Sequence, residues 1–94
     1  VSFTRLEKLL PVPIGFIESG GYLVALIKPQ SEVAKNEVGQ GGIVRDPILH
    51  RNVCTRIQDW LSGMAGWTVL GVDESPIRGA GGNAEFLIAA RFVS

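Results

Sequence analysis

Residues 22–29 of this chain read YLVALIKP. A short, continuously apolar run is typical of a strand that is buried on both faces, as in parallel sheets. Gly20 and Gly21 precede it as a turn signal, and Pro29 cannot continue a central strand. Lys28 is therefore expected at the carboxyl edge of a parallel sheet, which is where α/β proteins bind their ligands. The alternative is that Lys28 only marks the exit of the strand into solvent, because lysine is normally exposed.

Length and composition indicate a small globular protein without a charge bias. The 94 residues suit one domain, 46% of them are hydrophobic, and the formal net charge is zero. This disfavours disordered chains, which are poor in hydrophobic residues, and domains dedicated to nucleic acid, which are usually basic. No apolar run approaches the roughly 20 residues that span a bilayer, and no signal-peptide pattern opens the sequence. The chain begins with Val1 rather than Met, so we expect a piece of a longer protein.

Cys54 is the only cysteine, which rules out an intrachain disulfide and fits a reducing, cytoplasmic location. We expect it to be a small, half-buried helix residue rather than a catalytic thiol. Its only possible histidine partner, His50, lies one turn earlier on the same helix. No metal site is expected.

The amino-terminal part predicts a short helix. Residues 1–3 resemble the tail of a strand, and Thr4 and Glu7 have the spacing of a capping box, so a helix is expected to start at Thr4. Pro11 and Pro13 are expected to interrupt or reset it.

The clearest pattern is an amphipathic helix after residue 45. Asp46 and Pro47 form a good helix start, with an acidic N-cap followed by proline at the first helical position. The helix is expected to end near Gly63 or Gly66. Apolar residues at helical spacing make one stripe: Leu49, Val53, Ile57, Trp60, Leu61 and Met64.

The carboxyl-terminal part predicts two strands. Residues 67–72 and 85–92 have strand patterns, and the turn-rich residues 76–82 connect them. This short link favours an antiparallel hairpin. The second strand is expected to place its alternating apolar residues on a single face: Phe86, Ile88, Ala90 and Phe92.

Two glycine clusters lie outside these elements. Residues 30–45 are expected to form a long polar loop, and loops of that length are usually functional or disordered. Its glycines at 39, 41 and 42 are a candidate phosphate cradle, although no strand directly precedes them. The glycines at 79, 81 and 82 are more typical of turn chemistry.

The order of elements indicates an α/β protein. We expect the carboxyl-terminal half of a doubly wound, Rossmann-like fold, with a mixed sheet that ends in an antiparallel edge hairpin. No GxGxxG turn precedes the helices.

Several segments together resemble one family. Residues 25–32, ALIKPQSE, are similar to the LIKPQFE strand end of the hemolysin A group of FtsJ-like RNA ribose 2′-O-methyltransferases. Residues 82–86, GNAEF, resemble its GNxEF element, and residues 1–3 resemble the end of its DVSF element. The match also includes residues 38–47 and 75–77, so it covers essentially the whole chain, in order.

The resemblance implies roles for two residues. Lys28 is similar to the second lysine, and Glu85 to the glutamate, of the Lys-Asp-Lys-Glu set with which these enzymes handle the ribose hydroxyl. The aspartate would lie just before Val1, and the first lysine and the S-adenosylmethionine loop further upstream. Residues 1–94 would therefore be a partial FtsJ-like methyltransferase domain without cofactor-binding residues, inactive by itself. The intact protein would methylate ribosomal RNA.

The chemistry is consistent with this assignment. A cation close to the 2′-hydroxyl favours the oxyanion that develops during methyl transfer. A lysine whose pKa is lowered can also accept the proton. Glu85 could orient Lys28 or bind the ribose; the alternative is a surface acid at the start of a strand.

Neighbouring residues could shape the site or contact RNA. Gln30 and Glu32 follow Lys28 closely, and Ser31 stands where the family usually has phenylalanine. Three cations could contact RNA phosphates, although each could equally be a solvated charge: Lys35, Arg45 and Arg51. The resemblance also implies a separate amino-terminal RNA-binding domain.

Two other classes of function stay open. An exposed sheet edge could serve a non-catalytic interaction module, and a homodimer through the first or last strand is expected. A pore-forming hemolysin is the other class, but the sequence lacks a membrane helix, a long basic amphipathic face and regular alternating strands.

Overall fold

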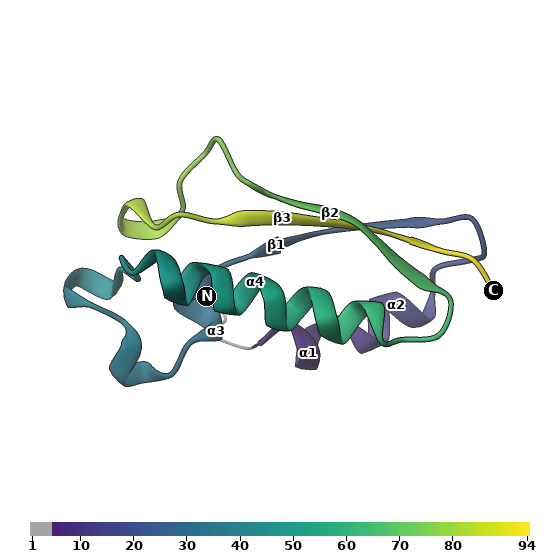
Figure 1. The fold of residues 1–94 in the computed structure, drawn as a ribbon, viewed down its shortest axis with the longest axis horizontal. Helices are drawn as coiled ribbons and strands as arrows, with labels where there is room; N and C mark the ends of the chain where they lie inside the picture. Colours follow the sequence, from purple (N-terminus) through teal and green to yellow (C-terminus); the bar gives the residue numbers. More distant parts are fainter. Residues whose placement is uncertain (1–4) are drawn as a thin grey trace.

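The computed structural model describes residues 5–94 of the chain. The helices are α1 (Leu6–Leu9), α2 (Pro11–Gly15), α3 (Pro29–Glu32) and α4 (Pro47–Ser62), and the strands are β1 (Tyr22–Ile27), β2 (Trp67–Glu74) and β3 (Phe86–Phe92). Short 3₁₀ turns lie in the connections: η1 (Lys35–Glu37), η2 (Gln40–Gly42) and η3 (Ala80–Gly82). The helices lie on one side of the sheet, with α4 running along it (Figure 1).

The strands form a three-stranded sheet in the order β1-β3-β2. The central strand β3 is antiparallel to both neighbours, with Ile27 opposite Phe86 on one side and Trp67 opposite Phe92 on the other. The predicted hairpin of the last two strands is confirmed. It lies at one edge of the described sheet, as expected, because β2 pairs only with β3. The expected parallel or mixed pairing is wrong for the described residues, because β3 inserts between β1 and β2 and separates the two strands that share a direction.

The expectation that β1 is buried on both faces is also wrong. Tyr22 and Val24 are 62% and 66% exposed, whereas Ile27 is fully buried. The strand has this alternation because the described helices cover only one face of the sheet, so every second side chain of β1 faces away from them. An apolar sequence alone did not distinguish a strand covered on both faces from one covered on a single face.

Helix α4 matches its prediction closely. The Asp46 side chain accepts a hydrogen bond from the Ile48 N–H at 2.9 Å, Pro47 is the first helical residue, and Gly63 follows the last turn. The side chains of Val53, Ile57 and Leu61 are buried against the sheet. Three others of the predicted stripe are half-buried: Leu49, Trp60 and Met64.

The proline prediction for the amino-terminal helix is confirmed, because α2 starts at Pro11. Arg5 is the N-cap of α1, and the predicted capping by Thr4 and the strand tail at 1–3 lie outside the described residues. Leu6, Leu10 and Ile14 still form one buried apolar row across the two short helices. They join α4 and the inner face of the sheet in a single hydrophobic core.

Candidate functional site

Lys28 lies where β1 ends. Its backbone is extended, with φ −109° and ψ 101°, and it is the N-cap of α3, which begins at the buried Pro29. The lysine is exposed and lines a pocket of about 350 Å³. Gln30, Asn83 and Glu85 share that pocket with it. The strand therefore ends where predicted, and it ends at a pocket.

Glu85 lies just before β3 and is only 5% exposed, so it is not a surface acid. Its Oε2 accepts a hydrogen bond from Gln30 Nε2 at 3.0 Å. A Cβ atom on Gly79 would lie 1.8 Å from the same oxygen, so glycine is required there to make room for the carboxylate. Although Lys28 lines the same pocket, the described residues contain no ion pair between Lys28 and Glu85.

Antiparallel pairing explains why these residues meet. Ile27 is the last residue of β1 and lies opposite Phe86, the first of β3. Lys28 and Glu85 are the next residues beyond this pair, so strands β1 and β3 bring them to the same end of the sheet. Residues from distant parts of the sequence therefore share one pocket.

Two glycine turns form another wall of this pocket. Residues 39–42 and 79–82 both read G-x-G-G. In each turn the last glycine N–H donates to the carbonyl of the first, at 3.1 Å in one and 3.0 Å in the other. Positive φ angles of 67–88° occur at their last two glycines. These contacts support the interpretation of both clusters as turns, and a phosphate-binding role for residues 39–42 stays a prediction.

Asn83 links the two turns, a role that sequence reasoning missed. Its side chain is 1% exposed, and Nδ2 donates to the Gly42 carbonyl at 2.9 Å and the Ala80 carbonyl at 2.8 Å. Its Oδ1 accepts from the Val44 N–H at 2.9 Å. The only signal for this role was its place in the GNAEF segment, directly after the second turn.

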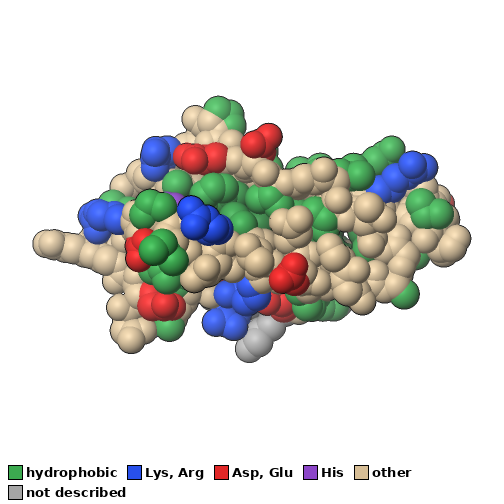
Figure 2. All heavy atoms as spheres, in the orientation of Figure 1, with side chains coloured by type: hydrophobic (Ala, Val, Ile, Leu, Met, Phe, Trp, Pro, Cys, Tyr) green, Lys and Arg blue, Asp and Glu red, His purple; other side chains and the backbone are tan. Residues whose placement is uncertain are grey.

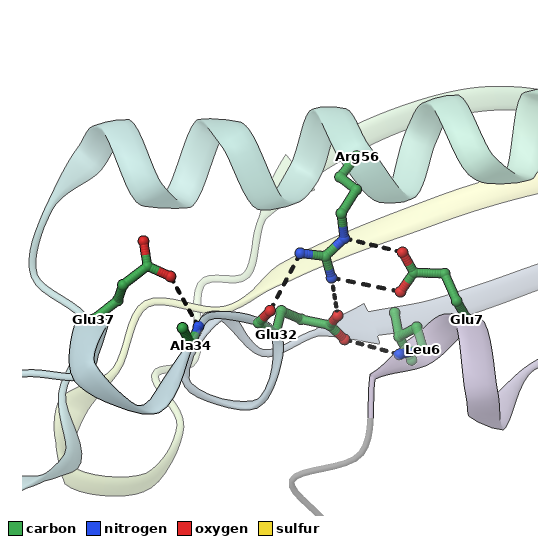
Figure 3. Close-up of polar contacts among 6 residues, drawn as sticks. All are labelled: Leu6, Glu7, Glu32, Ala34, Glu37 and Arg56. Carbon is green, nitrogen blue, oxygen red and sulfur yellow. Dashed lines mark hydrogen bonds and ion pairs between the residues drawn. The ribbon is translucent and has the colours of Figure 1, made fainter.

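A second missed feature is the charged cluster of Glu7, Glu32 and Arg56, which joins α1, α3 and α4 (Figure 3). Arg56 Nε binds Glu7 Oε2 at 2.9 Å, and the guanidinium also binds a side-chain oxygen and the carbonyl of Glu32. The second Glu32 oxygen accepts from the Leu6 N–H at 3.0 Å. Arg56 lay outside the apolar stripe, so its pattern resembled that of an ordinary solvated charge.

The pKa values of the two carboxyl groups in this cluster are shifted in opposite directions. Burial is the largest influence on Glu32 and raises its pKa, although the Leu6 N–H and Arg56 oppose this. Burial also acts to raise the pKa of Glu7, but the hydrogen bond and charge of Arg56 outweigh it and leave that pKa lowered. Because Glu32 belongs to α3, the cluster holds in place the segment that follows Lys28.

The three candidate RNA-contacting cations do not gather at one place. Lys35 is exposed and lines a second pocket, of about 590 Å³, beside the first. Arg45 donates to the Gln40 carbonyl at 3.0 Å, and Arg51 lies on α4 in a groove that also contains acidic Asp73. Figure 2 shows basic and acidic side chains interspersed over the face that it displays. Their contact with RNA stays a prediction.

Thiol and metal chemistry find no support in the described residues. Cys54 is half-buried, and burial raises the pKa of its thiol, which disfavours the reactive thiolate. His50 is engaged by the Val44 carbonyl at 2.7 Å. Residues 5–94 contain no group of three or more His, Cys, Asp or Glu side chains that could hold a metal ion, and no helix among them is long and apolar enough to cross a membrane.

Comparison with curated proteins gives relatives over nearly the whole chain. It is 42% identical over 88 residues to "Putative rRNA methyltransferase YqxC" of Bacillus subtilis, and 38% identical over 95 residues to "16S/23S rRNA (cytidine-2'-O)-methyltransferase TlyA" of Mycobacterium tuberculosis. "Hemolysin A" of Brachyspira hyodysenteriae is 36% identical over 91 residues. These alignments cover 93–97% of this chain and 31–36% of the relatives, so the chain spans about a third of their length.

Solved structures show the same fold. A "putative hemolysin" from Streptococcus thermophilus superimposes with a TM-score of 0.86 and 37% identity, over 100% of this chain and 34% of that one. A second putative hemolysin, from Lactococcus lactis, superimposes with a TM-score of 0.85 and 39% identity, over 96% of this chain and 42% of that one. The FtsJ-like methyltransferase family matches residues 1–92. The chain therefore belongs to the FtsJ-like methyltransferase family.

Proposed function

We propose that this chain forms the ribose-binding part of an rRNA 2′-O-ribose methyltransferase, with Lys28 and Glu85 as its site residues. The observation that supports this best is that both line one pocket, although they are far apart in the sequence. Membership of a methyltransferase family gives the reaction class. Two relatives are named as rRNA methyltransferases, and TlyA is named for the 2′-oxygen of cytidine, so ribosomal RNA in the cytoplasm is the proposed substrate.

In this proposal Lys28 acts on the ribose hydroxyl. Its ammonium group lies at an exposed strand end, where it can approach a 2′-oxygen and favour the negative charge that develops on that oxygen. Glu85 is held by Gln30, so its carboxylate offers the ribose a fixed acceptor. The hydroxyl gives its proton to the Glu85 carboxylate as the new oxygen–carbon bond forms, and the bond between that carbon and the sulfonium sulfur breaks.

S-adenosylmethionine, when bound, supplies the methyl group as a sulfonium. We assign no residue of this chain to its pocket. The relatives are about three times as long as the segment they share with this chain. We place the cofactor pocket in the part that is not shared, and we expect the chain by itself to be inactive.

The test is transfer of a labelled methyl group from S-adenosylmethionine to ribosomal RNA by the intact protein. Lys28→Ala should abolish transfer while the protein stays folded by circular dichroism. Arg91→Ala is the matched control, because it removes an exposed cation on β3 and should leave transfer unchanged. An intact protein that transfers nothing, or a Lys28→Ala protein as active as its parent, would contradict the proposal.

A second candidate is an interaction module, favoured by the sheet edges. Among the described strands, β1 and β2 each pair only with β3, and apolar side chains such as Val24 and Leu70 are exposed. Unpaired edges can template pairing with another chain. The expected homodimer through the last strand is wrong, because β3 is the central strand of the described sheet and is paired on both sides. A homodimer through β1, the first described strand, stays a prediction, which sedimentation of the chain tests directly.

A further inference from the structure

The amide nitrogen of Gln30 makes a hydrogen bond, whereas its amide oxygen has none among the described residues. Nε2 donates to Glu85 at 3.0 Å, while Oε1 is buried and has no hydrogen-bond partner among the described residues. Turning the amide round would place its oxygen against the carboxylate, so the nitrogen must face Glu85. A buried acceptor without a partner is costly, so the contact of Gln30 with Glu85 is kept at the expense of this oxygen.

Gln30 lies in the wall between two pockets. One is the Lys28 and Glu85 pocket, and the other is the larger pocket of about 590 Å³ that also contains Lys35. Gln30, Ser31 and Gly42 line both. Among the described residues, the pocket around Arg45 and His50 shares no lining residue with the Lys28 and Glu85 pocket.

The larger pocket suits a flat ring with polar edges. Val33 and Val38 give it apolar walls, whereas Gln30 and Lys35 give it polar ones. Heteroaromatic rings bind in this way, with their faces on apolar groups and their edges on a few placed polar atoms. A nucleobase has these properties, and its glycosidic bond joins C1′, the ring carbon next to the one that carries the 2′-hydroxyl. A base must therefore lie directly beside the pocket that holds its ribose.

We infer that the larger pocket binds the base of the target nucleotide, and that Gln30, in the wall between the two pockets, separates that base from its ribose. This inference rests on the proposed function and extends it, because it divides the site into a ribose part and a base part. Gln30 borders both parts and is a positioning residue for Glu85.

The test combines two changes in one double-mutant cycle: a substitution that fills the base pocket, and an RNA that lacks the base. Val38→Trp fills the pocket from its wall, and Val24→Trp is the matched control, because it adds the same side chain on the exposed face of β1. The RNA carries either the normal target nucleotide, mapped with the parent enzyme, or an abasic ribose at that position. Methyl transfer by the intact protein is measured as kcat/KM for all four combinations of parent or Val38→Trp with either RNA.

We expect the parent to lose at least about 10-fold in kcat/KM on the abasic RNA, the size of one lost specific base contact. Val38→Trp should show a similar loss on normal RNA and little further loss on the abasic one, because coupled changes are not additive. Val24→Trp should behave like the parent. If circular dichroism shows that Val38→Trp is unfolded, Val38→Phe takes its place with the same expectation.

The outcomes separate this inference from the proposed function. If Lys28→Ala is inactive but Val38→Trp keeps full activity on normal RNA, the base binds elsewhere and the inference is overturned while the function stands. The same holds if the change from normal to abasic RNA lowers kcat/KM of Val38→Trp by as large a factor as it lowers that of the parent. If the intact parent transfers no methyl group to normal RNA, the proposed function fails, and the base pocket with it.

Discussion

The Gln30 amide holds the Glu85 carboxylate at 3.0 Å, and this contact joins the segment after β1 to the segment before β3. A Cβ atom on Gly79 would lie 1.8 Å from the same carboxylate oxygen, so the Gly79 backbone approaches the acid more closely than any side chain would allow. The acid is therefore hydrogen-bonded by Gln30 and tightly enclosed by Gly79, in a pocket that Lys28 also lines. A preorganised acceptor of this kind is what positioning a substrate hydroxyl requires.

The approach of Gly79 to Glu85 predicts that even a methyl group is not tolerated there. Gly79→Ala would place Cβ 1.8 Å from Glu85 Oε2, so the carboxylate must leave the position in which it accepts the Gln30 hydrogen bond. We expect methyl transfer by the intact protein to fall at least about 10-fold, because small misplacements at a site are costly. Gly71→Ala is the control, since nothing lies within 4 Å of its Cβ position. Equal activities of the two variants would contradict the assignment of Glu85.

The link that Asn83 makes between the glycine turns predicts a stability effect. Asn83→Ala leaves the Val44 N–H and the Gly42 carbonyl without their partner, at a cost of about 1–3 kcal/mol. Urea unfolding of the 94-residue chain measures this. The exposed Asn36→Ala should change the free energy of unfolding by less than about 0.5 kcal/mol. An Asn83→Ala effect as small as that of the control would show that the turns hold their shape without this side chain.

The charged cluster predicts an asymmetric response to substitution. Arg56→Ala leaves the buried Glu32 without its cation, which should destabilise the chain by about 3 kcal/mol, the low end for a broken buried pair because Arg56 is partly exposed. Adding Glu32→Gln to Arg56→Ala should restore part of the loss, because the uncompensated charge is then gone. Arg51→Ala on the same helix is the control and should cost less than about 0.5 kcal/mol. No rescue by the second substitution would mean that Arg56 acts through packing rather than charge.

The opposite pKa shifts of Glu32 and Glu7 predict opposite pH dependences. The folded pKa of Glu32 is above the ordinary value of 4.5, so its contribution to stability is present at lower pH and is lost as the pH rises through the folded pKa. The pKa of Glu7 is lowered, so its contribution is present above the ordinary value and is lost as the pH falls through the folded pKa.

These dependences are measured by urea unfolding between pH 3 and pH 7, a window of about two units around the ordinary carboxyl values. As the pH rises, the stability of the parent should fall relative to Glu32→Gln and rise relative to Glu7→Gln. Slopes of the same sign for both variants would show that the two carboxyl groups do not divide the Arg56 charge in this way.

The absence of assigned cofactor residues predicts that the 94-residue chain does not bind S-adenosylmethionine. Calorimetric titration should show no saturable heat, whereas the intact protein should bind the cofactor in the same buffer. Saturable binding by the chain alone would contradict our placement of the cofactor pocket in the part of the relatives that this chain does not share.

Local sequence patterns determined most of the elements of this protein. The acidic cap and proline at residues 46 and 47 set the start of α4, and apolar spacing set its buried face. Pro29 ended β1 next to Lys28, and the short link at residues 76–82 set the hairpin of β2 and β3. These features depend on neighbouring residues, so they can be predicted from the sequence. The resemblance to a family, rather than any local pattern, singled out Lys28 and Glu85.

Only the tertiary structure decided what depends on contacts between distant segments. The insertion of β3 between β1 and β2 made every described pairing antiparallel and brought Glu85 to Lys28. The same packing buried Glu32 beneath Arg56 and placed Asn83 between two glycine turns. A charged or amide side chain has the same local pattern in solvent as in a network. Its role is set by the partners that folding brings to it, and those partners are far away in the sequence.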